Sequence, residues 1–137
     1  HNHTGPGQPE TMSVASFVAQ VRRIAAGTAP PRLTVGNLAS TREFLDVRDV
    51  VRAYRLLLEK GRPGQAYNIA SGRPVSLASL VDTLVQLAGV NPAREVDPAR
   101  FRATDASAPL DTRRLVRDTG WTPAFPLEAT LRDMLAG

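Results

Sequence analysis

The sequence contains no cysteine, which excludes disulfide bonds, thiolate nucleophiles and cysteine-ligated zinc. No stretch approaches the ~20 consecutive apolar residues that a membrane-spanning helix needs. The amino terminus lacks the basic segment followed by an apolar segment that marks a secretory signal. We therefore expect a soluble, cytoplasmic protein that does not bind membranes and is stabilised by side-chain packing.

Lysine and aromatic residues are also scarce. Lys60 is the only lysine, so arginine supplies nearly all of the positive charge behind the net charge of +4. The charge balance favours an anionic partner, and an arginine guanidinium can bond two phosphate oxygens at once. The arginines are dispersed and aromatic residues make up only 5% of the chain, whereas nucleic-acid binders gather the two together. We expect phosphate recognition without nucleic-acid binding.

Apolar residues at helical spacing, interrupted by glycine and proline, divide the chain into short elements after a loop over residues 1–10. The pattern predicts helices over 13–27, from Asp46 or Asp49 to Gly61, over 76–89, over 112–119 and over 126–137. It predicts short strands over 33–35, 43–47, 66–70 and 95–97. The predicted buried stripe of the second helix consists of Val50, Val51, Tyr54, Leu57 and Leu58.

The alternation of strands and helices favours an α/β architecture, made mostly of helices with a few short strands. Only one or two of the predicted strands could be central to a sheet. A parallel sheet needs both faces covered and its strands paired, and the strand that contains Tyr67 has too few neighbours in this chain. The sequence therefore predicts part of a domain.

Three segments carry a resemblance to a known family: NHTGPGQ at residues 2–8, VGNL at 35–38 followed by REFLDVRD at 42–49, and GWTP at 120–123. Their order and spacing resemble the extended short-chain dehydrogenases/reductases that act on nucleotide sugars. The loop at 2–8 is most similar to that of GDP-4-keto-6-deoxy-D-mannose reductases, whereas GDP-mannose 4,6-dehydratases carry an arginine-rich version. The resemblance implies that residues 1–137 are the carboxyl-terminal, nucleotide-sugar-binding portion of a Rossmann-type enzyme whose amino-terminal dinucleotide-binding half is absent.

The same resemblance implies which residues bind the diphosphate of a GDP-sugar substrate. Asn2 and Arg42 match positions that contact the diphosphate in this family. Arg102 lies in the segment FRATD, where the family places another such arginine, and Asp105 of that segment would bond the nucleoside. Ala103 stands where the family usually has a proline, which would stiffen the loop.

Further contacts are implied for the base and for the cofactor. The turn of Gly36, Asn37 and Leu38 would lie along the guanine, although from the residues alone it could equally be a tight turn that needs an unusual φ. Val14 would face the nucleotide at the start of the first helix, where unpaired backbone donors favour anions. The backbone of His3 would approach the nicotinamide of NAD(P)H.

The catalytic parts of the family are missing from the sequence. The glycine fingerprint that binds a dinucleotide does not occur. Neither does a tyrosine followed four residues later by lysine, because Tyr54 is followed at that distance by Leu58 and Tyr67 by Ser71. We therefore expect no catalytic residue in this chain, no activity from it alone, and NAD(P)H bound mainly by the absent half.

Three interpretations remain open. The parent protein is a reductase of GDP-4-keto-6-deoxy-D-mannose, or a GDP-mannose 4,6-dehydratase or UDP-sugar epimerase, or the chain is a non-catalytic nucleotide-sugar-binding module. In each case we expect the chain to pair with its amino-terminal half or with another copy, as a homodimer. His1 and His3 have no nearby acid cluster, so no metal site is expected.

Overall fold

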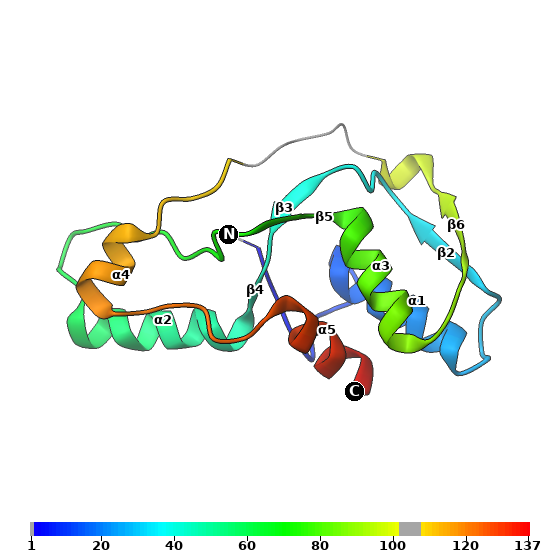
Figure 1. Ribbon diagram of the computed structural model, residues 1–137, viewed down its shortest axis with the longest axis horizontal. Coiled ribbons are helices and arrows are strands. Elements are labelled where there is room, and N and C mark those ends of the chain that lie inside the picture. Colours follow the sequence, from blue (N-terminus) through cyan, green and yellow to red (C-terminus); the bar gives the residue numbers. More distant parts are fainter. Residues whose placement is uncertain (1, 102–107) are drawn as a thin grey trace.

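The computed structural model describes residues 2–101 and 108–137. Figure 1 shows α1, α3 and α5 gathered in one group and α2 beside α4 in another. No helix in the described ranges is long and apolar enough to cross a membrane. The helices are α1 (Ser13–Ala25), α2 (Val47–Lys60), α3 (Leu77–Ala88), the 3₁₀ helix η1 (Pro98–Arg100), α4 (Arg113–Thr119) and α5 (Leu127–Ala136).

The strands are short and form three separate pairs in the described residues. Two of the pairs are parallel and one is antiparallel, so the expected α/β character with few short strands is confirmed. The pairs are β1 (His3–Thr4) with β4 (Leu45–Asp46), β2 (Arg32–Val35) with β6 (Ala93–Val96), and β3 (Thr41–Glu43) with β5 (Pro74–Ser76).

The larger core lies between α1, α3, α5 and β2. Val21 of α1, Leu33 of β2, Leu84 of α3 and Leu131 of α5 are all completely buried in it. Full burial of such side chains contributes roughly 1.5–3 kcal/mol each. The helices predicted over 13–27 and 76–89 are confirmed, because their apolar faces form this core.

The smaller core joins α2 to α4 and explains the GWTP segment. Trp121 and Leu115 are buried there. The Trp121 indole donates a hydrogen bond to the carbonyl of Asp49, 3.0 Å away. The buried Asp49 carboxylate accepts from the backbone N–H groups of Ala124 and Phe125, each at 3.0 Å. Asp49 therefore fixes the chain that follows Trp121 against the first turn of α2.

Asp46 caps the amino-terminal end of α2, so of the two predicted helix starts, Asp46 and Asp49, the first is confirmed. Its side chain is fully buried, accepts from the Thr130 hydroxyl at 2.7 Å and forms an ion pair with Arg48 at 2.6 Å. Arg48 also pairs with Asp133 at 2.8 Å and lies over the Phe125 ring. Burial disfavours the charged carboxylate, but the bonds from Arg48 and Thr130 outweigh that cost and hold the pKa of Asp46 below its ordinary value.

The buried stripe predicted for α2 is only partly right. Val50 is buried and Leu57 is half-buried, but Val51, Tyr54 and Leu58 are 59%, 58% and 89% exposed. The exposed row has the same i, i+3, i+7 spacing as a buried row. The sequence pattern therefore does not distinguish the face that this chain covers from the face that it leaves open.

The strand predicted over 66–70 is wrong, because that segment is irregular and no described strand pairs with it. Side chains hold it instead. The Tyr67 hydroxyl donates to Asp118 and accepts from the Arg62 N–H, both at 2.9 Å. Arg114 donates to the carbonyl of Ala66 at 2.8 Å. A β-prone composition forms a strand only where a neighbour supplies a ladder.

Several predicted boundaries also differ from the structure. The strand expected over 43–47 is divided into β3 and β4, and α2 already begins at Val47. The strand expected over 95–97 begins earlier, as β6, and β5 was not predicted. The predicted stop at Gly27 is confirmed, because α1 ends at Ala25 and Gly27 adopts a left-handed φ of 70°.

Candidate functional site

An open pocket of about 570 Å³ lies where the start of α1, the turn after β2, strand β3 and η1 meet. We name it the α1 pocket. Its size is in the range of small-ligand sites. It is lined by Asn2, Glu10, Thr11, Met12, Ser13, Ser16, Phe17, Gly36, Asn37, Ser40, Arg42, Phe44, Leu77, Ala99 and Arg100.

The start of α1 brings backbone donors to this pocket. Met12 is the residue before the helix and provides no side-chain hydrogen bond to cap it. The first turn therefore carries N–H groups without an intrahelical acceptor and the positive end of the helix dipole. Val14 is 2% exposed and belongs to the larger core, so its side chain does not line the pocket. Only its backbone could face a ligand.

The turn after β2 forms a second wall. The Asn37 side-chain oxygen accepts from the Ala39 N–H at 3.0 Å, which closes the turn locally. The alternative of a tight turn with an unusual φ is wrong, because neither Gly36 nor Asn37 has a positive φ. Leu38 packs against the larger core rather than lining the pocket. Its carbonyl accepts from the N–H of Ala78 at 3.0 Å.

Two arginines stand at the pocket. Arg42 comes from β3, and one of its guanidinium nitrogens donates to the carbonyl of Thr41 at 2.9 Å. Arg100 comes from η1, pairs with Asp97 at 3.3 Å and reaches the Ser16 hydroxyl at 3.5 Å. Their positive charge and the helix start favour an anion in this pocket.

The loop before α1 supplies Asn2 and is braced by its own side chains. The carbonyl of Asn2 accepts from the Leu45 N–H at 3.1 Å, so the residue is fixed beside β4. Gln8 folds back and donates to the carbonyl of His3 at 3.1 Å. The buried Thr4 hydroxyl donates to Gln8 at 2.7 Å. These contacts give a structural reason for the NHTGPGQ pattern.

The structure thus brings Asn2, Asn37 and Arg42 to one pocket, and their binding roles stay predictions. Arg102 and Asp105 lie outside the described residues. Sequence reasoning missed Arg100, which is one of many dispersed arginines. The available signal was Asp97 followed by Pro98, which is typical of a helix start, and the Asp97 carboxylate does cap η1.

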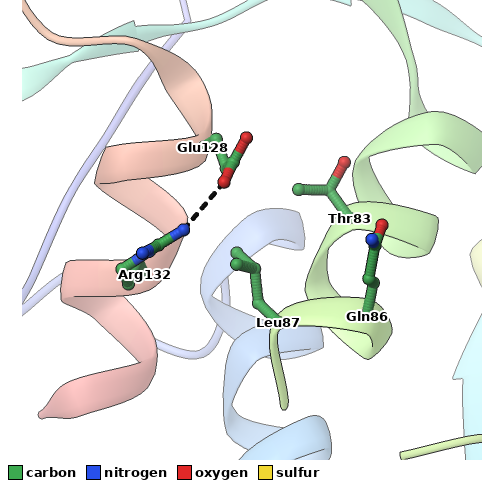
Figure 2. A pocket seen from close by; sticks show the side chains of 5 residues that line it. All are labelled: Thr83, Gln86, Leu87, Glu128 and Arg132. Carbon is green, nitrogen blue, oxygen red and sulfur yellow. Dashed lines mark hydrogen bonds and ion pairs between the residues drawn. The ribbon is translucent and has the colours of Figure 1, made fainter. Parts of the chain in front are cut away.

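A second hollow, the α3–α5 groove, has a volume of about 500 Å³ and lies between two exposed helix faces. Figure 2 shows that Glu128 and Arg132 of α5 point toward each other, and they pair at 2.8 Å. Thr83, Gln86 and Leu87 form the α3 side. Among the described residues, no group of three metal-ligating side chains lies together.

Comparisons with known proteins show the family of the chain. The sequence profile of the family described as GDP-mannose 4,6 dehydratase matches residues 1–134. The chain is 36% identical over 136 residues to GDP-6-deoxy-D-mannose reductase from Pseudomonas aeruginosa. This alignment covers 98% of this chain and 45% of that protein. It is 35% identical over 97 residues to human dTDP-D-glucose 4,6-dehydratase, covering 66% of this chain and 27% of that protein.

Solved structures of nucleotide-sugar enzymes also match the fold of this chain. The structure of RMD from Pseudomonas aeruginosa complexed with NADPH matches with a TM-score of 0.88 and 36% identity, over 98% of this chain and 44% of that one. UDP-glucose 4-epimerase from Thermotoga maritima, solved with UDP-glucose, matches with a TM-score of 0.80 and 28% identity, over 98% and 42%. The chain therefore spans less than half the length of these structures.

Proposed function

The chain belongs to the GDP-mannose 4,6-dehydratase family of extended short-chain dehydrogenases/reductases, and on that premise we propose that it is the nucleotide-sugar-binding portion of an NAD(P)H-dependent reductase. Its substrate is GDP-4-keto-6-deoxy-D-mannose. In the parent protein, hydride passes from NAD(P)H to the 4-keto carbon of the sugar. This chain supplies substrate affinity and specificity, and it works in the cytoplasm.

The observation that carries the proposal is the meeting of Asn2, Asn37 and Arg42 at the α1 pocket. They come from three separate segments, beside the uncapped start of α1. A diphosphate presents many acceptor oxygens and two or more negative charges, so it needs donors that converge from several directions. The Asn2 amide, the α1 backbone and the guanidinium groups of Arg42 and Arg100 supply such donors.

The choice of reductase rests on the 36% identity to a GDP-6-deoxy-D-mannose reductase over 98% of the chain. A GDP-mannose 4,6-dehydratase aligns with 99% of the chain, but at 24% identity. A GDP-mannose 4,6-dehydratase is the second candidate, because the matching family profile carries that description. Both candidates bind a GDP-sugar, so the role given to the α1 pocket is the same in each.

The proposal assigns the chemistry to a companion amino-terminal half, which holds NAD(P)H and the catalytic tyrosine and lysine. We assign one cofactor contact to this chain, between the backbone of His3 and the nicotinamide. The exposed row Val51, Tyr54 and Leu58 supports such a partner, since an apolar row of this kind is normally covered. A second copy of the chain could cover the same row.

The test is an assay of the full-length parent protein with NADPH and candidate sugars. We expect NADPH to be oxidised when GDP-4-keto-6-deoxy-D-mannose is added, and the 137-residue chain alone to bind GDP without oxidising NADPH. Conversion of GDP-mannose with no net consumption of NADPH would establish the dehydratase instead. Reduction of dTDP-linked but not GDP-linked keto sugars would refute the assigned nucleotide.

A further inference from the structure

Glu43 is a completely buried carboxylate whose hydrogen-bond donors come from two distant parts of the chain. One oxygen accepts from the Gly72 N–H at 2.8 Å and from the Ser71 hydroxyl at 3.3 Å. The other accepts from the Leu110 N–H at 3.2 Å. A buried carboxylate is costly unless its oxygens are satisfied, so these three bonds hold both segments firmly against β3.

The place of Glu43 in β3 connects this cluster with the α1 pocket. Arg42 and Phe44, its two neighbours in sequence, both line the pocket, whereas Glu43 does not. Successive side chains of an extended segment point to opposite sides. The carboxylate therefore anchors β3 from behind, on the side away from the pocket.

Strand β3 depends on this anchor because its ladder is short. It pairs with β5 over three residues, and Glu43 lies opposite Pro74, which has no N–H to donate. The Gly72 bond to the carboxylate extends the connection beyond that proline. Gly72, whose N–H donates this bond, has a φ of 67°. Glycine adopts this left-handed conformation without the steric penalty that a side chain would bring.

We propose that Glu43 is a positioning residue for phosphate binding: without touching the ligand, its carboxylate fixes the part of β3 that presents Arg42 to the α1 pocket. This inference rests on the proposed function, because it takes the ligand to be a nucleoside diphosphate. Loss of the anchor should weaken contacts made through Arg42 more than contacts made by the turn at Gly36 and Asn37, which comes from a different segment.

The test compares Glu43→Ala and Glu43→Gln in the 137-residue chain, with GDP and guanosine as ligands. GDP affinity is measured by calorimetry and guanosine affinity by ligand-observed NMR. We expect Glu43→Ala to weaken GDP binding about tenfold and guanosine binding less than about twofold. Glu43→Gln should weaken GDP binding about threefold, because its amide keeps one of the two acceptor oxygens. The matched control is Glu59→Gln, at an exposed residue paired with Arg55, and it should change neither affinity.

Urea unfolding of each variant separates positioning from loss of the fold. If Glu43→Ala does not fold, the ratio of GDP to guanosine affinity in Glu43→Gln decides the matter. Equal weakening of both ligands, or unchanged GDP affinity in a folded variant, would overturn the inference while leaving the proposed function intact. Failure of the unaltered chain to bind GDP would overturn the proposed function and this inference with it.

Discussion

The carbonyl oxygen of Arg100 lies so close to Gly36 that it occupies the space that a Cβ at Gly36 would need. The turn after β2 and helix η1 are therefore in backbone contact at the wall of the α1 pocket. Glycine is required here by close approach rather than by an unusual φ. Both residues line the pocket, so their contact sets part of its shape.

Gly36→Ala should push η1 away from the turn, since the obstructing atom is backbone and not a flexible side chain. We expect a loss of about 1–3 kcal/mol in the free energy of unfolding, as for other overpacked sites. GDP affinity should fall as well. The control is Gly64→Ala, where φ is 76° and no atom is within 4 Å. That variant should lose about 1 kcal/mol of stability and keep its GDP affinity. Urea unfolding and calorimetry give both quantities.

Arg42→Ala should weaken GDP binding by about 2 kcal/mol, because it removes a charge-assisted contact to phosphate. The effect on guanosine should be small. Arg22→Ala is the matched control: it removes the same charge from an exposed position in the last turn of α1. Calorimetry at two salt concentrations separates a local contact from the general field of the protein. Equal weakening by the two variants would contradict the assignment of Arg42.

Asp46→Asn should destabilise the fold by about 2 kcal/mol at neutral pH, because the buried group loses its charge-assisted bonds to Arg48 and Thr130. The pKa of Asp46 is lowered in the folded state. Its contribution to stability is therefore complete above the unfolded pKa of about 3.9 and is lost as the pH falls through the lower folded pKa. The difference in unfolding free energy between the two proteins, measured from pH 7 to pH 2, should become smaller as the pH falls below about 3.9. A difference that stays constant over that range would count against this account.

The α2 row of Val51, Tyr54 and Leu58 should drive the isolated chain to associate. We expect the 137-residue chain to sediment as a dimer or larger species. A double variant, Tyr54→Gln with Leu58→Glu, should sediment as a monomer. Val96→Glu, at an exposed site of β6 far from α2 in Figure 1, should not change the association. A chain that is monomeric without substitution and binds no apolar dye would show that the row needs no partner.

Much of the fold follows from the sequence where a pattern has one physical solution. The helices around Phe17 and Leu80 combine an apolar face with a glycine stop, and both are present. The strand predicted around Tyr67 is not present, because a strand needs a neighbouring strand and the local sequence does not show whether there is one. The burial predicted for the outer face of α2 is wrong for a related reason. The row through Leu58 has the spacing of a core row whether or not the same chain covers it.

The candidate site was predictable only in part. Family motifs place Asn2, Asn37 and Arg42, and the structure brings all three to the α1 pocket. Val14 follows from the start of the first helix and Leu38 from the VGNL motif, but the Val14 side chain is buried in the larger core and the Leu38 side chain packs against it. The Asp97-Pro98 helix start precedes Arg100 in the sequence, but the place of Arg100 at the pocket depends on the close packing of η1 against Gly36.

The most direct test of the account is a GDP titration of the ¹⁵N-labelled chain followed by amide chemical shifts. We predict saturable shifts for Ser13, Asn37 and Arg42, which come from three of the elements that line the α1 pocket. The amides of Gln86 and Leu87 in the α3–α5 groove should not move. Shifts confined to that groove, or no shift at GDP concentrations that saturate related enzymes, would contradict the claim that this chain binds the nucleotide of a GDP-sugar.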